Sequence, residues 1–328
     1  SALRDRLIDK ACGAGSREVD RLTNRRYLPK TEARLYNWPL RDMRRSYILD
    51  LDEDLLAVTS VKNENGATTI PLADILLEPA SLGKPYQNIQ IDLASTSYFL
   101  AQQTHQQALE VTGRWGYSED TESAGTLAAA MLAADPTLDC SDASEIDVGQ
   151  SLLIDTEMLF VTARAAITSG TTISANLTAD HSNVTVAVAD GTKVKLGEVI
   201  LLGSEKMLVE DVVGNNLTVQ RAWDGTVLAA HTSGATVNVY RRLSVDRGVN
   251  GTTAAAHTNA TAISKYAPPE DISNLSLALA VAYYHQHQAA WTGEIGSPEH
   301  TTESSMKALG SLRERVRKQY RRIVVGAV

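Results

Sequence analysis

The chain contains an internal repeat whose two halves lie at two different offsets. Residues 137–161 (TLDCSDASEIDVGQSLLIDTEMLFV) align without gaps with residues 185–209, at an offset of 48 residues. Residues 217–240 (LTVQRAWDGTVLAAHTSGATVNVY) align without gaps with residues 243–266, at an offset of 26 residues. Self-similarity of this kind indicates a supersecondary unit that the chain uses twice.

The order of these segments is first half, first half, second half, second half, which results when one complete module is inserted into the middle of another. The repeat therefore predicts an outer β-module split into residues 137–164 and 243–266. Residues 165–242 are predicted to hold a polar linker, 165–184, followed by the nested inner β-module. A pairing in which hairpins are exchanged between the two copies agrees with the same pattern.

The inserted region is predicted to be all-β, because Thr, Val, Ala, Gly and Asn dominate it. Asp224-Gly225 and Asn250-Gly251 occupy the same module position and predict hairpin turns, since such turns need residues with positive φ. His231 and His257 also recur at one module position. Because no second His or Cys lies beside either histidine in the sequence, we expect both to be hydrogen-bonded turn or packing residues rather than metal ligands.

Two arginines recur in the same way, Arg221 in the inner module and Arg247 in the outer one. Glu205 and Glu157 occupy matched positions in the first halves of the same modules. Our hypothesis is that each arginine reaches the glutamate of its own module as a structural ion pair.

Outside the repeat, the pattern changes between helix and short strand. Residues 3–24 place apolar side chains at helical spacing, which predicts an amphipathic helix or a pair of helices broken near Gly13 and Gly15. Short β-favouring runs separated by turn residues then predict a small sheet. These runs are residues 34–36, 47–51, 57–61 and 108–112.

Helix returns after Pro268-Pro269, because proline is tolerated in a first turn and Glu270 and Asp271 favour the positive end of the helix dipole. Residues 272–290 are apolar nearly all round, which predicts a helix buried among neighbours. A last helix is predicted after Thr301 and Thr302. Its apolar stripe is Met306, Leu309, Leu312, Val316 and Tyr320.

These elements predict an α+β fold. Residues 1–136 and 267–328 are expected to form a helical bundle core with a small β-sheet, and the two nested β-modules form an all-β insertion in it. No apolar run approaches the 18 or so residues of a membrane span, so we expect no membrane segment and synthesis in the cytoplasm.

Motifs of catalysis are not found, so the chain is predicted to be no enzyme and to carry no cofactor or metal. The carboxylates of residues 50–54 alternate like cation ligands but lack the glycine of a calcium loop, and a solvated turn is the preferred interpretation. His285 and His287 are two residues apart on a helix and so point to different faces.

The candidate interaction site is the basic end of the chain. It comprises Arg313, Arg315, Arg317, Lys318, Arg321 and Arg322, followed by the extended tail Ile323, Val324 and Val325. One interpretation is a solvated helix face. The other is electrostatic contact with DNA phosphates or with an acidic partner surface.

Three short segments resemble the head-tail connector (adaptor) family of tailed bacteriophages. They are Asn24-Arg-Arg-Tyr27 after the first helix, residues 111–117 (VTGRWGY), and Pro-Glu-Asp-Ile272 at the start of the Ala-rich helix. The likeness covers residues 1–118 and 268–322, and the segment ending RGVNGTTAAAH257 is similar to an insert of such adaptors. This chain departs from the family pattern by doubling that insert.

The resemblance implies a virion protein of the phage neck, at the head-tail junction. It implies a homo-oligomeric ring, a dodecamer that matches the portal protein, through whose lumen the packaged DNA passes. The ring would dock beneath the portal and offer a platform to a tail or head-completion (stopper) protein, without membrane contact. The competing interpretation is a virion binding module, in which the twin β-modules recognise capsid, fibre or carbohydrate.

Overall fold

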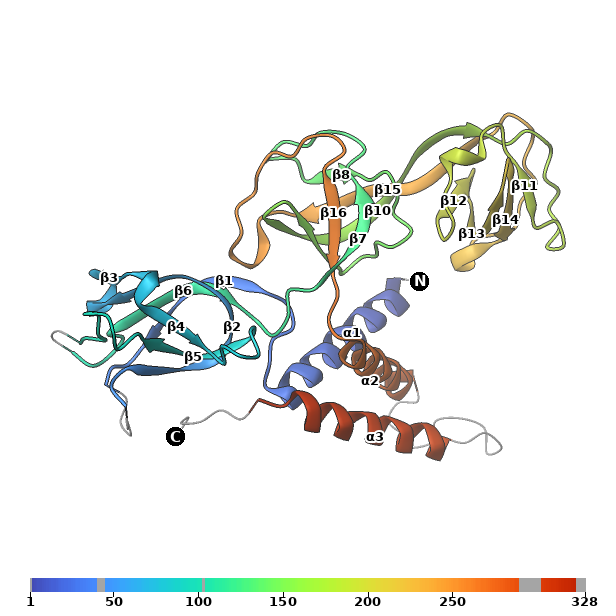
Figure 1. The fold of residues 1–328 in the computed structure, drawn as a ribbon. Coiled ribbons are helices and arrows are strands. Elements are labelled where there is room, and N and C mark those ends of the chain that lie inside the picture. Colours follow the sequence, from blue (N-terminus) through green and yellow to red (C-terminus); the bar gives the residue numbers. More distant parts are fainter. Residues whose placement is uncertain (1, 40–44, 102–103, 289–301, 323–328) are drawn as a thin grey trace. The chain divides into compact units, whose positions relative to one another are not determined.

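The computed structural model describes residues 2–39, 45–101, 104–288 and 302–322, and the chain divides into two compact units (Figure 1). Unit 1 comprises Ser1–Asp120 and Ala267–Val328, and unit 2 comprises Thr121–Tyr266. The insertion therefore begins 16 residues earlier than the repeat alone indicates.

The predicted helical bundle core is wrong, because the structure is mostly β. The described residues hold three α helices, whereas unit 1 contains a six-stranded antiparallel sheet and unit 2 a ten-stranded one. The predicted short strands 47–51 and 57–61 are pieces of one strand, β2 (Ile48–Asn63). In the first part of β2, acidic residues alternate with buried leucines. Because these acidic residues are also typical of turns, the sequence predicts two short strands with a turn between them instead of one long strand.

The helices of unit 1 are α1 (Ala2–Thr23), α2 (Glu270–Gln288) and α3 (Thr302–Tyr320). They share a small core of Val19, Tyr27, Ile272, Leu275, Leu279, Val316 and Tyr320. Helix α1 is continuous, so Gly15 marks no break. It allows close contact with α2, since a Cβ at Gly15 would lie 2.6 Å from the carbonyl oxygen of Ser276.

The sheet of unit 1 has the strand order β1-β6-β2-β5-β4, with β3 paired to the far end of β2. Besides β2, its strands are β1 (Lys30–Tyr36), β3 (Thr68–Ile70), β4 (Ile75–Glu78), β5 (Tyr86–Ile91) and β6 (Leu109–Trp115). One face covers a core that includes Leu49, Leu55, Ile89, Val111 and Trp115. Beta-branched and aromatic residues at alternate positions explain why these segments form strands.

Unit 2 consists of two small β-modules joined by two long strands, β10 (Glu157–Thr172) and β15 (Thr236–Asp246), which run side by side from one module into the other (Figure 1). The outer module adds β7 (Thr121–Thr126), β8 (Thr137–Asp139), β9 (Ser151–Ile154) and β16 (Ala262–Tyr266). The inner module adds β11 (Thr185–Ala187), β12 (Val199–Leu202), β13 (Glu205–Val213) and β14 (Asn216–Gln220).

The two modules repeat each other in register. In the outer module Leu138 pairs with Leu243, and in the inner module the matched residues Val186 and Leu217 pair in the same way. The bulge that follows Val161 in β10 recurs after the matched residue in β13. Each hydrophobic core is built from one module's own residues, so no hairpin is exchanged.

The structural repeat extends further than the sequence repeat. The bridge between Met131 and His257 in the outer module matches the bridge between Leu177 and His231 in the inner one. Residues 167–172 lie within the segment predicted as a linker, but they form the second half of β10 and pair with the first half of β15. In the outer module, β7 pairs with β16 in the matching way. Both modules therefore begin with a strand that lies outside the gap-free sequence repeat.

The inner module is inserted at one turn of the outer module. In the inner module, β13 and β14 are joined by the tight turn Gly214-Asn215. At the matched place in the outer module, the whole inner module takes the place of this turn. A hairpin turn tolerates such an insertion because its two ends already lie side by side.

The predicted hairpin turns at Asp224-Gly225 and Asn250-Gly251 are only partly correct. All four residues have positive φ, as expected, but they lie in the short helices η4 (Trp223–Gly225) and η5 (Val249–Gly251). The strands that flank them are not neighbours in the sheet. Each turn instead opens a loop that returns across its module.

Candidate functional site

The candidate site in unit 1 is a joint where the end of α1, the sheet and the end of α3 meet. Three tyrosines contact one another edge to face, with ring centroids 5.5 Å apart for Tyr27 and Tyr117 and 5.8 Å apart for Tyr117 and Tyr320. The guanidinium of Arg25 lies 4.7 Å from the ring centre of Tyr117, within range of a cation–π contact. The joint thus brings together segments far apart in the sequence.

A buried ion pair closes this joint. Asp54 of β2 is fully buried between the guanidinium groups of Arg25 and Arg322, and the Nη1 atom of Arg322 lies 3.2 Å from its carboxylate. Arg322 also donates to the carbonyl oxygen of Leu51 at 2.7 Å, and its backbone N–H donates to that of Thr23 at 2.8 Å. The end of α3 is therefore fixed to both the sheet and α1.

Burial controls the ionisation of this pair. Removal from water raises the pKa of Asp54, although Arg25 and Arg322 act in the opposite direction, and burial lowers the pKa of Arg322. The interpretation of residues 50–54 as a solvated turn is wrong for Asp54. Asp54 has the same parity in β2 as the exposed Asp50 and Asp52, and it is buried because Arg25 and Arg322 cover it. Arg322 lies 268 residues further along the chain.

The basic residues predicted as an interaction site separate into two groups. Arg322 is buried in the joint, and Arg313 pairs with Glu18 of α1. Arg315, Arg317 and Lys318 lie on the exposed side of α3, and Arg321 directly follows the helix. Arg315 contacts Asp271 at 2.7 Å, Arg317 contacts Glu314 at 2.7 Å, and Lys318 lies 3.8 Å from Glu314.

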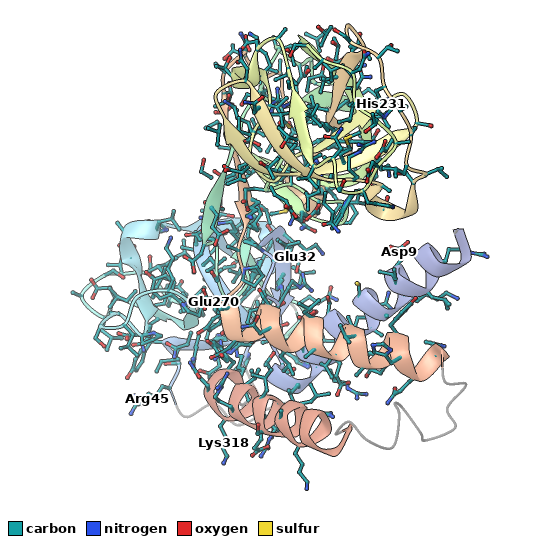
Figure 2. All side chains as sticks on the ribbon, turned by 90° about the vertical axis from the view of Figure 1, so that its right-hand side faces the viewer. Asp9, Glu32, Arg45, His231, Glu270 and Lys318 are labelled. Atoms are coloured by element: carbon teal, nitrogen blue, oxygen red, sulfur yellow. The ribbon has the colours of Figure 1, made fainter. Side chains whose placement is uncertain are left out.

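Lys318 projects from α3 with 74% of its side chain exposed (Figure 2). Arg321 is also exposed and forms no ion pair within the described ranges. Ile323, Val324 and Val325 lie outside the described residues. Arg315, Arg317, Lys318 and Arg321 are therefore exposed at this end of the chain, and Asp271 and Glu314 offset part of their positive charge.

A polar pocket of about 320 Å³ lies beside the joint. It is lined by Asp20, Asn24, Arg25, Arg26, Arg34, Asp52 and Glu53. Arg34 is held by Glu32 at 2.7 Å and Asp52 at 3.1 Å, and it stacks 4.4 Å above the Trp115 ring. These charges neutralise one another within the protein, so the pocket serves to hold α1 against the sheet.

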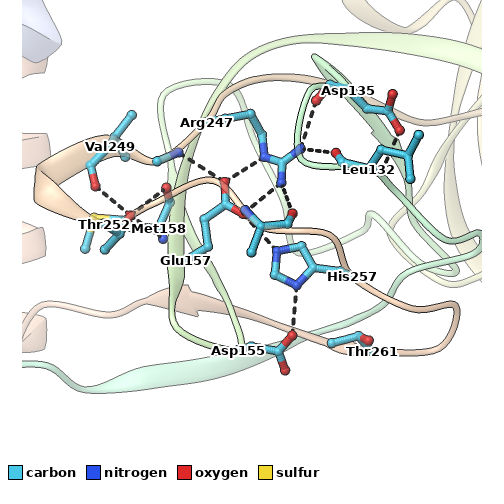
Figure 3. A network of polar contacts seen from close by, with 12 residues as sticks. Leu132, Asp135, Asp155, Glu157, Met158, Arg247, Val249, Thr252, His257 and Thr261 are labelled. Atoms are coloured by element: carbon cyan, nitrogen blue, oxygen red, sulfur yellow. Dashed lines mark hydrogen bonds and ion pairs between the residues drawn. The ribbon is translucent and has the colours of Figure 1, made fainter.

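Each module of unit 2 contains a buried network centred on a glutamate. Figure 3 shows the network of the outer module, around Glu157. In the outer module, Arg247 donates to both carboxylate oxygens of Glu157 at 2.6 and 2.8 Å, and His257 lies 2.9 Å away. In the inner module, Arg221 donates to Glu205 at 2.7 and 2.9 Å. The hypothesis that these arginines pair with these glutamates is confirmed.

The networks hold loops in place. Backbone N–H groups of Gly248 and Ala255 donate to Glu157, and Arg247 donates to the carbonyl oxygens of Leu132 and Asp135. Although burial alone would raise it, these hydrogen bonds, led by that of Arg247, lower the pKa of Glu157 to about 2. Arg221, His231 and two backbone N–H groups likewise lower the pKa of Glu205 to about 2.

The recurring histidines are hydrogen-bonded packing residues, as predicted. His257 is buried, with its Nε2 atom on Glu157 and its Nδ1 atom 2.8 Å from Asp155. Within the described residues, no group of three potential metal ligands could hold a metal ion.

None of the helices in the described part of the chain is both long and apolar enough to cross a membrane.

Comparison of the chain with models of known protein families, with curated protein sequences and with solved structures finds no match.

Proposed function

We propose that the chain is a structural subunit of a phage head-to-tail connector ring, which docks beneath the portal and extends the DNA channel. The observation that carries the proposal is the joint of unit 1. The three segments that resemble the adaptor family contribute Tyr27, Tyr117 and Ile272 to the same region of the structure. The packing of these residues in one region of unit 1 supports the proposal.

In this proposal the exposed basic face of α3 contacts the acidic or phosphate-bearing partner. Arg315, Lys318 and Arg321 supply the charge, and Arg322 holds the helix in place instead of touching the partner. Clustered bases attract a polyanion chiefly through electrostatics, so the contact weakens steeply with salt.

Charge reversal tests this contact better than truncation. A chain that ends at residue 312 would lose Val316, Tyr320 and Arg322 from the core and the joint, so lost binding would only report misfolding. We expect Arg315→Glu, Lys318→Glu and Arg321→Glu together to abolish capture of the chain by assembled portal rings.

The matched control reverses three exposed bases elsewhere, Lys10→Glu, Arg17→Glu and Lys195→Glu, and should leave capture intact. Circular dichroism should show both variants folded. Equal capture of the two variants would contradict the assignment of the basic face, and electron micrographs without rings on wild-type complexes would contradict the proposed function.

The twin modules of unit 2 favour a second candidate, a virion binding module. Unit 2 is a compact unit with two cores of its own, and its ends are adjacent because the N–H of Ala267 donates to the carbonyl oxygen of Asp120 at 3.0 Å. Excision of 121–266 with a short Gly-Ser closure should therefore leave unit 1 folded. If the chain without unit 2 still forms rings that join the portal, unit 2 is peripheral to assembly. If this chain no longer attaches to the portal, the result favours the virion binding module.

A further inference from the structure

We propose that Arg164, Glu198 and Arg241 form a junction lock, which holds the two modules of unit 2 at one fixed orientation and makes unit 2 a single rigid body. The lock is independent of the proposed ring, because it lies between the two modules of unit 2. It gives the inner module a constant direction relative to the outer one.

The junction needs a lock because only two strands cross it, β10 and β15 (Figure 1). Pairing of β15 with the inner strand β12 ends at Val239, and its pairing with the outer strand β8 begins at Arg242. Between these points Tyr240 and Arg241 lie opposite Ala166 alone. Such an interruption bends a strand and disrupts its ladder, and a two-stranded ribbon is only marginally stable by itself. The strands alone would therefore fix the angle between the modules poorly.

Arg241 belongs to both modules at once. Its carbonyl oxygen accepts a hydrogen bond from the N–H of Cys140 in the outer module at 2.9 Å. Its guanidinium donates to both carboxylate oxygens of Glu198 in the inner module at 2.6 and 2.8 Å, and to the carbonyl oxygen of Lys193 at 3.0 Å. The side chains of Arg241 and Glu198 are only 12% and 2% exposed. A buried two-point contact of this kind fixes direction as well as distance.

Arg164 connects the modules from the other strand, β10. Its Nη2 atom donates to the carbonyl oxygen of Ala143 in the outer module at 2.9 Å. The same atom donates to the carbonyl oxygen of Tyr240, the last residue of the inner repeat segment, at 3.0 Å. The interrupted part of the ladder is therefore tied to the outer module by a side chain.

The modules also touch directly at one turn. A Cβ at Gly197 of the inner module would lie 3.5 Å from the Cβ of Ser144 in the outer module. A Cβ at the matched residue of the outer module, Gly149, would meet nothing within 4 Å. The turn of the inner module thus packs against a neighbour that the matched turn of the outer module lacks.

The repeat indicates that the lock serves the junction and not the fold of a module. Each lock residue has a matched position in the other copy, and none of these positions is charged. The matches are Arg164 with Val212, Glu198 with Gln150, and Arg241 with Ala267. The first match follows from the ladder, where Arg164 and Val212 face equivalent leucines. Both copies have the same fold, so a module does not require these charges in order to form.

A rigid unit 2 has a consequence for binding. A partner that contacts both modules finds them already arranged. Its binding therefore costs less conformational entropy than binding to two modules that move independently.

Distances between two spin labels, one on each module, test the lock in the full chain. The labels are attached at Leu132→Cys in the outer module and Val227→Cys in the inner one, since these side chains are 67% and 79% exposed. Cys12→Ser removes the exposed native thiol, and Cys140 is buried. Double electron–electron resonance should give one narrow distance distribution. A broad distribution from this chain would overturn the proposal.

The lock is removed by giving each position the residue of its match, with Arg164→Val, Glu198→Gln and Arg241→Ala together. The modules should stay folded, because replacement of both partners of a buried ion pair is often neutral for stability. Slow hydrogen exchange of the amides of Ala229 and Ala255, which donate to the two central glutamates, verifies this. We expect the narrow distribution to become broad. A distribution that stays narrow would show that the strands alone orient the modules, and the proposal would fall.

The matched control is Arg242→Ala. Arg242 pairs with Asp139 of β8 at 2.7 Å, so this substitution removes a neighbouring arginine ion pair on the outer side of the junction. Its distance distribution should stay narrow, and equal broadening in the control would contradict the assignment of the lock. If the triple variant unfolds, Glu198→Gln with Arg241→Ala, which removes the ion pair alone, decides between the same two outcomes.

Discussion

The outer and inner modules of unit 2 share a backbone and a buried network but differ in the residues around them. Residues 137–161 of the outer module contain no Lys or Arg, whereas residues 185–209 contain three lysines. An ion pair of Lys206 and Asp224 in the inner module, 2.6 Å long, is replaced in the outer one by a contact between Met158 and Asn250. The surfaces have diverged, while the glutamate, arginine and histidine at the centre have not.

The comparison indicates which residues a module needs in order to fold, the central network, and which residues can differ between the two copies, those on the surface. Glu157 and Glu205 are fully enclosed and each receives charge-assisted hydrogen bonds from an arginine. A buried carboxylate without its partners would carry a large desolvation cost, so neither copy can lose one member alone. An exposed ion pair contributes little and is easily replaced.

Removal of the central glutamate should have the largest effect and should affect both modules alike. We expect Glu157→Ala and Glu205→Ala each to lower the free energy of unfolding by about 3–5 kcal/mol, because each leaves a buried arginine unpaired. Hydrogen exchange of the amides of Ala255 and Ala229, which donate to these glutamates, measures the loss module by module. Exchange that accelerates in both modules after one substitution would show that they unfold as one unit.

Acidification should destabilise both modules in the same pH range. The folded pKa of Glu157 and of Glu205 is about 2, below the ordinary value of 4.5. A lowered folded pKa gives stability that is complete above pH 4.5 and is lost as the pH falls from 4.5 toward 2. The loss is about 3 kcal/mol for each module.

Urea unfolding of the full chain between pH 2 and pH 6 measures this dependence. In the Glu157→Gln chain, the outer module should lose its pH dependence in this range while the inner module keeps its own. A pH dependence that persists unchanged in both modules of this variant would show that other carboxylates cause it.

The sequence predicts the networks well and the fold of unit 1 poorly, for physical reasons. Arg247 and Glu157 can be paired from sequence because the repeat presents the same two residue types at matched positions twice. Asp54 offers no such signal, since its partner Arg322 lies at the other end of the chain and only the tertiary fold brings them together. The ladder of β2 with β6 is similarly non-local, and short-range periodicity does not encode it.

The strands that begin each module show the limit of sequence comparison. Residues 121–126 (TESAGT) and 167–172 (ITSGTT) take matched places beside β16 and the first half of β15, yet they lie outside the two gap-free repeat segments, although both are rich in Thr, Ser and Gly. Backbone pairing sets their position, and the pairing tolerates many side chains at half-exposed positions. The repeat is therefore visible in sequence only where a buried side chain or a turn constrains it.

The two modules carry different small residues at the insertion point, Gly191 in the inner module and Ala143 in the outer one. A Cβ at Gly191 would lie 2.0 Å from the carbonyl oxygen of Gly214, in the turn of the inner module. The matched residue of the outer module is the buried Ala143, which has room because the inserted module replaces that turn. We expect Gly191→Ala to cost about 1–3 kcal/mol by overpacking and Ala143→Gly to cost about 0.5–1 kcal/mol.

Thermal unfolding of the two variants measures these costs. If Gly191→Ala left the unfolding temperature unchanged, the turn at Gly214-Asn215 would be able to move away from the added methyl group. In that case the turn would not press on Gly191, and the insertion would not explain why the two modules carry different residues here.

The smallest effect is expected where the copies differ at a single hydrogen bond. The carboxylate of Asp155 accepts a hydrogen bond from the Nδ1 atom of His257 at 2.8 Å, and the matched residue in the inner module is Gly203. Asp155 has a φ of 53° and its side chain is 61% exposed. Asp155→Gly removes a solvent-screened hydrogen bond, which lowers the stability of the outer module, and relieves the strain of a non-glycine residue with positive φ, which raises it. Each effect on the free energy of unfolding is below about 1 kcal/mol, and the two have opposite signs.

The reciprocal change Gly203→Asp should also alter the stability of the inner module by less than about 1 kcal/mol, because it adds a hydrogen bond to His231 and the same backbone strain. Denaturant midpoints of both variants measure the balance, with Glu157→Gln as the reference for a broken network. If Asp155→Gly destabilised the outer module as much as Glu157→Gln, the aspartate would be a member of the central network. Each module would then depend on a different set of residues, and the shared centre would be smaller than the glutamate, arginine and histidine that both copies retain.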